Sequence, residues 1–130
     1  MSGREGYLFD TNVLIYFLAG KLPEDSLERI EDILRYSFCI SVITKLEILG
    51  WKGHTEESFR ETKSFLENAD IIGLEDKIVD ETINLRRHKN IKLPDAIIAA
   101  TAIVYQKILI TNNEKDFKNV VKIWNPLRGS

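Results

Sequence analysis

The sequence predicts an α/β fold, a three-layer α/β/α sandwich around a central, mainly parallel sheet of about five strands. Short apolar runs alternate with longer segments of helical period along the chain. Because parallel neighbours need a crossover helix to return the chain, this alternation favours a parallel sheet covered by helices. The 130 residues, 44% of them hydrophobic, suffice for one sizeable core. We therefore predict a single domain over residues 1–130, with short tails at 1–6 and 126–130.

The first part of the chain predicts a strand followed by two helices. Residues 7–9 form a short apolar run, and the Asp-Thr-Asn sequence at 10–12 is typical of a helix N-terminus before apolar residues 13–18. Apolar side chains within 27–34 recur at helical spacing among charged residues. This pattern predicts an amphipathic surface helix that ends near Arg35.

A second strand and two more helices are expected next. Residues 38–40 form another short apolar run, and Ser41 is a suitable N-cap for a helix over about 42–49. Gly50 is placed to end that helix. Residues 56–68 then predict a further helix.

The second half of the chain repeats the alternation. Residues 71–73 predict a brief strand, and 76–88 predict a helix with apolar residues available to the core. Residues 93–104 are apolar nearly all round, which indicates a helix buried on most faces. Strands are predicted at 107–110 and at 120–123, separated by a polar turn or short helix.

Composition limits the classes of partner and compartment. Lys plus Arg total 18 and Asp plus Glu total 20, so the net charge of -2 predicts that any contact with nucleic acid is local. Cys39 is the only cysteine, which excludes an intrachain disulfide or a thiolate metal cluster and favours a reducing compartment. No apolar run approaches the roughly 18 residues of a membrane-spanning helix. We therefore expect a cytoplasmic protein without membrane contact.

Four acidic residues follow predicted strands or lie near helix starts. Asp10 follows the first strand, Glu47 lies in the helix after the second, Asp95 lies in the first turn of the apolar helix, and Asp116 follows the fourth strand. Ligands of parallel α/β sheets bind beyond the carboxyl ends of the strands, so these acids should converge there. Clustered carboxylates repel one another unless a cation neutralises them, and oxygen ligands select Mg²⁺ or Mn²⁺.

Each acid also has a purely structural explanation. Asp10 can cap a helix, and Glu47 can lie on the solvent face of its helix. Asp95 can stabilise a helix dipole by ~0.3–1 kcal/mol, and Asp116 can be an exposed loop acid. The convergence of several acids at one edge, rather than any single acid, predicts the metal site.

Two histidines and a group of basic residues are further candidates for ligands or phosphate contacts. His54 and His88 lie in polar segments, where solvated side chains are expected instead of metal ligands. A basic cluster precedes Asp95 and could contact substrate phosphates; its members are Arg86, Arg87, Lys89 and Lys92. The alternative is a solvated helix end whose positive charges complement the helix dipole.

Four blocks of sequence together resemble the PIN-domain ribonucleases. They are LFDTNVL at 8–14, SVITKLE at 41–47, LPDAIIAA at 93–100 and TNNEKDF at 111–117. No single block is specific, but four blocks in this order, in a chain of this size, make a strong joint match. The resemblance covers nearly the whole chain and is closest to the VapC-type toxins of toxin–antitoxin pairs.

The resemblance implies an Mg²⁺- or Mn²⁺-dependent endoribonuclease that acts on RNA. Water activated at the acidic site would attack phosphorus, and no side-chain nucleophile is required. It implies that the catalytic and metal-binding residues are Asp10, Glu47, Asp95 and Asp116. Supporting polar positions are matched by Thr11, Asn12, Ser41, Thr44 and Thr111. Asn113 is a departure, since many relatives carry an acid there. A homodimer and a small antitoxin partner are implied by the resemblance alone.

Three other classes of protein share some of these features. A haloacid-dehalogenase-type phosphatase needs a second Asp two residues after the first, where this chain has Asn12. A response-regulator receiver needs an acidic pair near the end of the first strand and a Lys after the fifth, and neither is convincing here. A PIN-like scaffold that binds RNA or protein with weak or no catalysis stays an alternative, with Asn113 marking a lost second metal site.

Overall fold

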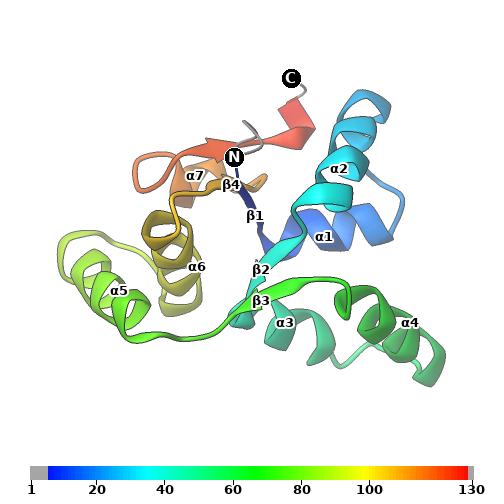
Figure 1. Cartoon of the computed structure of the whole chain (residues 1–130), viewed down its shortest axis with the longest axis horizontal. Helices are drawn as coiled ribbons and strands as arrows, with labels where there is room; N and C mark the ends of the chain where they lie inside the picture. Colours follow the sequence, from blue (N-terminus) through cyan, green and yellow to red (C-terminus); the bar gives the residue numbers. More distant parts are fainter. Residues whose placement is uncertain (1–5, 129–130) are drawn as a thin grey trace.

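The computed structural model describes residues 6–128 and shows short strands alternating with helices (Figure 1). The strands are β1 Tyr7–Phe9, β2 Cys39–Ser41, β3 Asp70–Ile72, β4 Ile108–Ile110 and β5 Ile123–Trp124. The helices are α1 Thr11–Leu18, α2 Glu24–Tyr36, α3 Val42–Leu49, α4 Glu56–Leu66, α5 Asp76–His88, α6 Leu93–Val104 and α7 Glu114–Phe117, with the 3₁₀ helix η1 Pro126–Arg128. Of the predicted tails at 1–6 and 126–130, residues 1–5 and 129–130 lie outside the described residues.

All strand pairs are parallel, as the alternation of strands and helices predicted. Ladder hydrogen bonds join β1, β4 and β5 in the order β1-β4-β5, and join β2 to β3. Strands β1 and β2 lie next to each other, so the two ladders meet along the β1–β2 line. The central sheet of the expected α/β fold is therefore present as a three-stranded and a two-stranded part.

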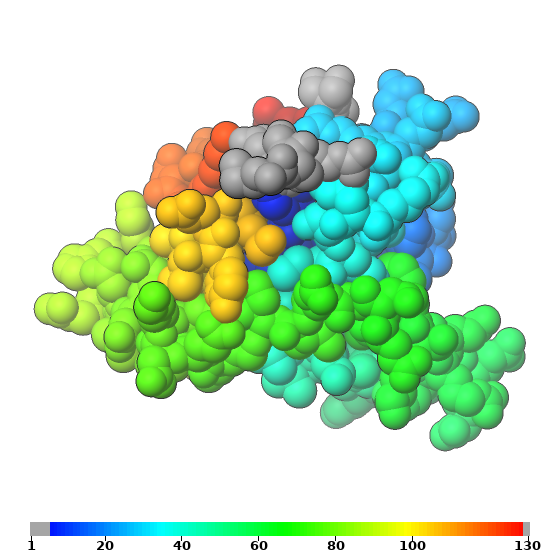
Figure 2. Space-filling model, viewed as in Figure 1, coloured from blue at the N-terminus to red at the C-terminus, as the bar shows by residue number. Residues whose placement is uncertain are grey.

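Strand β1 is buried on both faces, which explains its uninterrupted apolar sequence. Leu8 packs into one core cluster with residues of α5, α6 and β4. Tyr7 and Phe9 point the other way, into a second cluster with residues of α1, α2 and β2. The two clusters are the two helix-covered sides of the sheet, and α4 and α5 lie at opposite ends of the long axis (Figures 1 and 2).

Several helix ends agree with the local sequence signals. The Ser41 hydroxyl accepts a hydrogen bond from the Ile43 amide and caps α3, and the Gly50 amide donates to the Leu46 carbonyl at its end. Helix α5 has the predicted bounds. Within residues 6–128, no helix is both long and apolar enough to span a bilayer.

The fifth strand begins later than predicted. The amides of Val120 and Val121 both donate to the Phe117 carbonyl, so this stretch is a turn after α7. Its valines pack against the core cluster that contains α6 and make no strand pair there. Pairing starts at Ile123, which lies opposite Leu109 of β4. Val120 and Val121 have the side chains of a strand, but their backbone amides bond the end of α7 and are not available for strand pairing.

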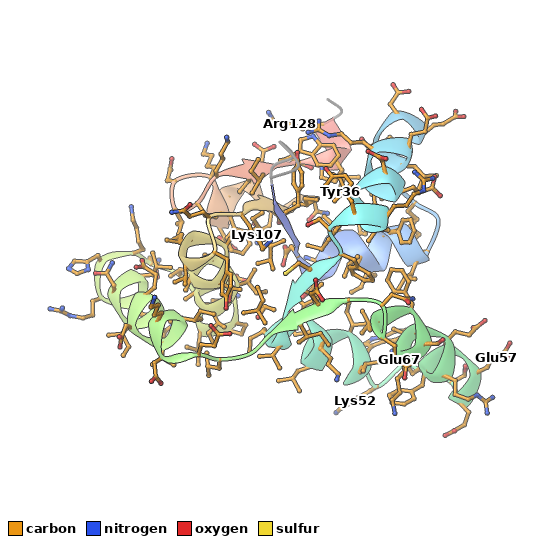
Figure 3. The ribbon with its side chains drawn as sticks, in the orientation of Figure 1. Tyr36, Lys52, Glu57, Glu67, Lys107 and Arg128 are labelled. Atoms are coloured by element: carbon orange, nitrogen blue, oxygen red, sulfur yellow. The ribbon has the colours of Figure 1, made fainter. Side chains whose placement is uncertain are left out.

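The expected C-terminal tail is structured over Pro126–Arg128. Pro126 is buried, and its carbonyl accepts a hydrogen bond from the Ser26 hydroxyl of α2. Arg128 Nε lies 3.0 Å from Glu114 Oε2, next to the start of α7. Figure 3 shows Arg128 and Tyr36 at the same end of the molecule, where η1 packs on α2. These contacts are long-range and leave no local sequence signal.

Candidate active site

Asp10 lies immediately after β1 and is held by two donors. Its Oδ1 accepts from the Thr11 amide at 2.8 Å, and its Oδ2 accepts from the Thr111 hydroxyl at 2.7 Å. Thr111 follows β4 directly, and Phe9 pairs with Ile110, so the parallel register brings the two residues together. Asp10 is only 5% exposed. The same carboxylate therefore caps α1 and lies at the carboxyl end of β1.

Glu47 reaches the same region from α3. The Thr11 hydroxyl donates to Glu47 Oε1 at 2.6 Å and lies 3.1 Å from the Thr44 hydroxyl. Thr44 is fully buried one helical turn before Glu47, whereas Glu47 as a whole residue is exposed. The carboxylate of Glu47 thus turns toward the sheet edge while part of its side chain stays in contact with solvent.

Asp95 and Asp116 complete the acidic set from the other side. Asp95 lies in the first turn of α6 and is half-buried. Asp116 is an exposed residue of α7, and Asn113 Nδ2 donates to Asp116 Oδ2 at 3.0 Å. Asn113 also caps α7, because its Oδ1 accepts from the Asp116 amide. The residue that departs from the family pattern therefore orients the fourth acid.

Burial and mutual repulsion perturb the two central acids. The pKa of Asp10 is raised to about 6, chiefly by burial and to a smaller extent by the charges of Asp95 and Glu47. Hydrogen bonds from Thr111 and Thr11 oppose this rise. The pKa of Asp95 is raised by burial first and then by the charges of Asp116 and Glu47, while Lys92 lowers it. These interactions link all four acids into one electrostatic cluster, which we call the acidic cluster.

The chemistry of the acidic cluster fits a hard divalent cation. Its donors are carboxylate oxygens, and burial together with the neighbouring carboxylates disfavours the ionised forms of Asp10 and Asp95, a cost that a cation would offset. As the side chains stand in residues 6–128, no three acidic, His or Cys groups are close enough to share an ion. Mg²⁺ needs only one or two carboxylates, because it keeps several of its waters.

The remaining predicted site residues divide into two kinds. Thr11, Thr44, Thr111 and Asn113 hydrogen-bond the acids or one another. Ser41 instead caps α3, and Asn12 is exposed. Both stay predictions as supporting residues.

The two histidines differ from each other. His54 is not simply solvated, because its ring nitrogens lie 2.9 Å from Ser58 Oγ and 2.8 Å from the Ile48 carbonyl. Its ring also makes edge contacts with Trp51 and Phe59. His88 is exposed at the end of α5, as expected. His54 thus joins the end of α3 to the start of α4.

The sequence did not indicate the apolar groove beside Glu47. A hollow of about 680 Å³ lies between α1, α3 and α4, and its walls include Ile15, Leu18 and Trp51. Trp51 is 63% exposed. Charged residues lie on the outer surface nearby, where Figure 3 shows Lys52, Glu57 and Glu67 pointing into solvent. Apolar spacing alone cannot separate such a groove from core positions.

Comparisons with known proteins agree with the fold. The sequence matches the PIN domain family over residues 7–123. A chain in a toxin-antitoxin complex from Klebsiella pneumoniae is 31% identical, with a TM-score of 0.76 over 93% of this chain and 98% of that chain. VapBC-1 from nontypeable Haemophilus influenzae is similar at 25% identity and a TM-score of 0.75, over 92% of this chain and 96% of that chain.

A DNA-bound VapBC complex from Salmonella typhimurium contains a chain with the same fold, with a TM-score of 0.78 at 23% identity over 93% of this chain and 98% of that chain. No curated protein matches the sequence.

Proposed function

The chain belongs to the PIN domain family, and from this premise we propose that it is a metal-dependent endoribonuclease that hydrolyses RNA phosphodiester bonds at the acidic cluster. One observation carries the proposal. Asp10 and Glu47 come from two separate segments and are both held by Thr11, through its amide and its hydroxyl. The charges of Asp95 and Asp116 act on the same group of carboxylates. A fold gains no stability from gathering like charges, so their convergence supports a site for cation and phosphate.

The chain's own residues have separable roles in this proposal. Asp10 and Asp95 would hold Mg²⁺ or Mn²⁺ directly, and Asp116 would hold a weaker second ion. When bound, the cation neutralises charge on the phosphate and acidifies water for attack on phosphorus. The Thr111 hydroxyl and the Thr11 amide keep the Asp10 carboxylate ionised and fixed. Glu47, aimed by Thr11 but still in contact with solvent, can orient water or accept its proton.

The direct test is cleavage of a panel of single-stranded and structured RNAs. We expect fragments to appear with Mn²⁺ or Mg²⁺ and not in the presence of EDTA, because without a cation the carboxylates of the acidic cluster repel the phosphate and water is not activated. Calorimetric titration with Mn²⁺ alone separates two kinds of failure. Metal binding without cleavage would indicate narrow RNA specificity, whereas neither binding nor cleavage would favour the PIN-like scaffold and reject the nuclease.

We also propose that the chain is the toxin of a toxin–antitoxin pair, a homodimer that a small antitoxin silences. The similar chain from Klebsiella pneumoniae belongs to a toxin-antitoxin complex, which supports this assignment. The apolar groove borders Glu47, so an apolar antitoxin segment bound there would lie beside the acidic cluster. A cytoplasmic location is part of the same proposal, supported by the free, buried Cys39. Sedimentation equilibrium would measure whether the chain has the mass of a homodimer or of a monomer in solution.

The groove assignment is testable with the antitoxin of the Klebsiella pneumoniae complex as the probe. Trp51→Ala is expected to weaken antitoxin binding by about tenfold or more, because exposed Trp side chains in a groove are common binding hot spots. Leu74→Ala is the matched control, since Leu74 is 52% exposed but lies outside the groove. Calorimetry gives both affinities. Equal affinities for the two variants would place the antitoxin elsewhere.

A further inference from the structure

A second hollow lies between the end of α5 and the start of α6. Its volume is about 530 Å³, within the usual range for small-ligand sites. Its walls combine the cationic and polar side chains of Arg86, Arg87, Lys89 and Asn90 with the apolar side chains of Ile83 and Leu93. We call it the α5–α6 pocket. Figure 1 shows α5 and α6 side by side at one end of the molecule.

Among residues 6–128, the cationic side chains of the α5–α6 pocket form no ion pair with a carboxylate. Residues 82–94 contain four Lys or Arg residues and no acid. Within residues 6–128, the ion pairs engage Arg35 and Arg128 instead. Arg86 donates to the Ile91 carbonyl at 2.9 Å, which fixes the loop that forms the pocket wall. Arg87 is exposed and carries its charge at the pocket.

The composition of the pocket suits a nucleotide better than a simple anion. Guanidinium and ammonium groups bind phosphate oxygens, and an Asn side chain can hydrogen-bond a ribose hydroxyl or a base edge. Ile83 and Leu93 are 53% and 51% exposed, so they offer apolar surface to a sugar or a base. An inorganic anion would leave that apolar surface in water.

The pocket is also placed next to the acidic cluster. Leu93 lines the pocket and begins α6, while Asp95 lies in the first turn of the same helix. Lys92 lies between them in sequence, and its charge acts on Asp95. A polyanion that reaches four carboxylates on a chain of net charge -2 needs cations beside its path.

We propose that the α5–α6 pocket binds a phosphate and its adjoining nucleoside of the RNA substrate, away from the scissile bond. This inference rests on the proposed nuclease function, which it deepens by assigning a substrate-binding site. Arg87 and Lys89 contact the phosphate, and Arg86 holds the pocket in shape. The pocket thereby fixes the direction in which the strand enters the acidic cluster.

The test measures RNA binding without cleavage. Asp95→Asn protein in EDTA is titrated with a short fluorescein-labelled single-stranded RNA at several salt concentrations, and anisotropy gives the affinity. Adding Arg87→Gln and Lys89→Gln is expected to weaken binding about tenfold and to lower the salt slope by about 0.7, the contribution of one single-strand phosphate contact. The matched control adds Arg35→Gln and Arg60→Gln, an equal charge change on exposed residues of α2 and α4.

Each outcome decides one claim. A loss of affinity confined to the pocket variant supports the proposal. Equal affinities in both double variants, with metal-dependent cleavage by the parent chain intact, would overturn the pocket and leave the nuclease standing. If the Asp95→Asn protein does not bind the RNA and the parent does not cleave it, both the pocket and the nuclease function are overturned. Calorimetric titration of the pocket variant with the antitoxin of the Klebsiella pneumoniae complex tests a protein ligand. A loss of antitoxin affinity with unchanged RNA affinity would assign the pocket to an acidic protein segment instead.

Discussion

Asp95→Asn is expected to lower metal-dependent RNA cleavage roughly 10²–10³-fold while leaving the stability of the metal-free protein unchanged or higher. The loss follows because an amide is a neutral and weaker donor for a hard cation at the reacting phosphate. The stability result follows because the substitution removes a charge that burial and the carboxylates of Asp116 and Glu47 disfavour. Initial cleavage rates in Mn²⁺ and urea unfolding in EDTA measure the two quantities.

The control for this variant is Asp76→Asn. Asp76 occupies the first turn of α5 as Asp95 occupies the first turn of α6, but it is exposed and lies outside the acidic cluster. It should lose only the interaction with the helix dipole, ~0.3–1 kcal/mol, and keep full cleavage activity. If Asp95→Asn instead loses as much stability as Asp76→Asn and still cleaves RNA, Asp95 is a helix-stabilising acid and not a catalytic one.

Asp10→Asn is expected to remove a pH-dependent loss of stability from the metal-free protein. Folding raises the pKa of Asp10 from its ordinary 3.8 to about 6, so the folded state keeps a proton that the unfolded state releases. The free energy of unfolding contributed by this group is therefore highest below about pH 4. It falls as pH rises and levels off above about pH 6, with a total change of about 3 kcal/mol.

Urea unfolding of both proteins in EDTA, between about pH 4 and pH 7, gives this contribution as a difference, because the titrating groups that do not interact with Asp10 cancel. Asn at position 10 can still accept from the Thr11 amide and can donate to the Thr111 hydroxyl, so the helix cap survives. Asp80→Asn, at an exposed site on α5, is the control and should run parallel to the parent. If the free energy of unfolding of Asp10→Asn changes with pH in parallel with that of the parent, folding does not raise the pKa of Asp10.

Local signals were sufficient to predict much of the fold. Ser41 and Gly50 predicted the ends of α3 because caps depend on neighbouring residues only. The parallel arrangement followed from the alternation of elements. The predicted start of β5 was wrong. Val120 and Val121 have strand-forming side chains, but their amides bond the end of α7.

The site was predictable only as a set of positions. The acids could be proposed as candidates because Asp10 and Asp116 follow strands and Asp95 opens a helix, while Glu47 lies in the helix after a strand. Parallel strands end at one edge, which brings such positions together. Which hydroxyl holds which carboxylate could not be predicted, since Thr111 and Asp10 are 101 positions apart in the chain. The role of Asn113 also needed coordinates, because its contact with Asp116 depends on the turn geometry of α7.

The acidic cluster spans the joint between the β1-β4-β5 ladder and the β2-β3 ladder. No ladder hydrogen bond connects these two parts of the sheet. Asp10 follows β1 on one side, while Thr44 and Glu47 follow β2 on the other, and the Thr11 hydroxyl crosses between them. A small separation of β1 from β2 would break no ladder, yet it would carry Glu47 away from Asp10. The geometry of the acidic cluster can thus be tuned by residues that pack along this joint, without any change to the acids themselves.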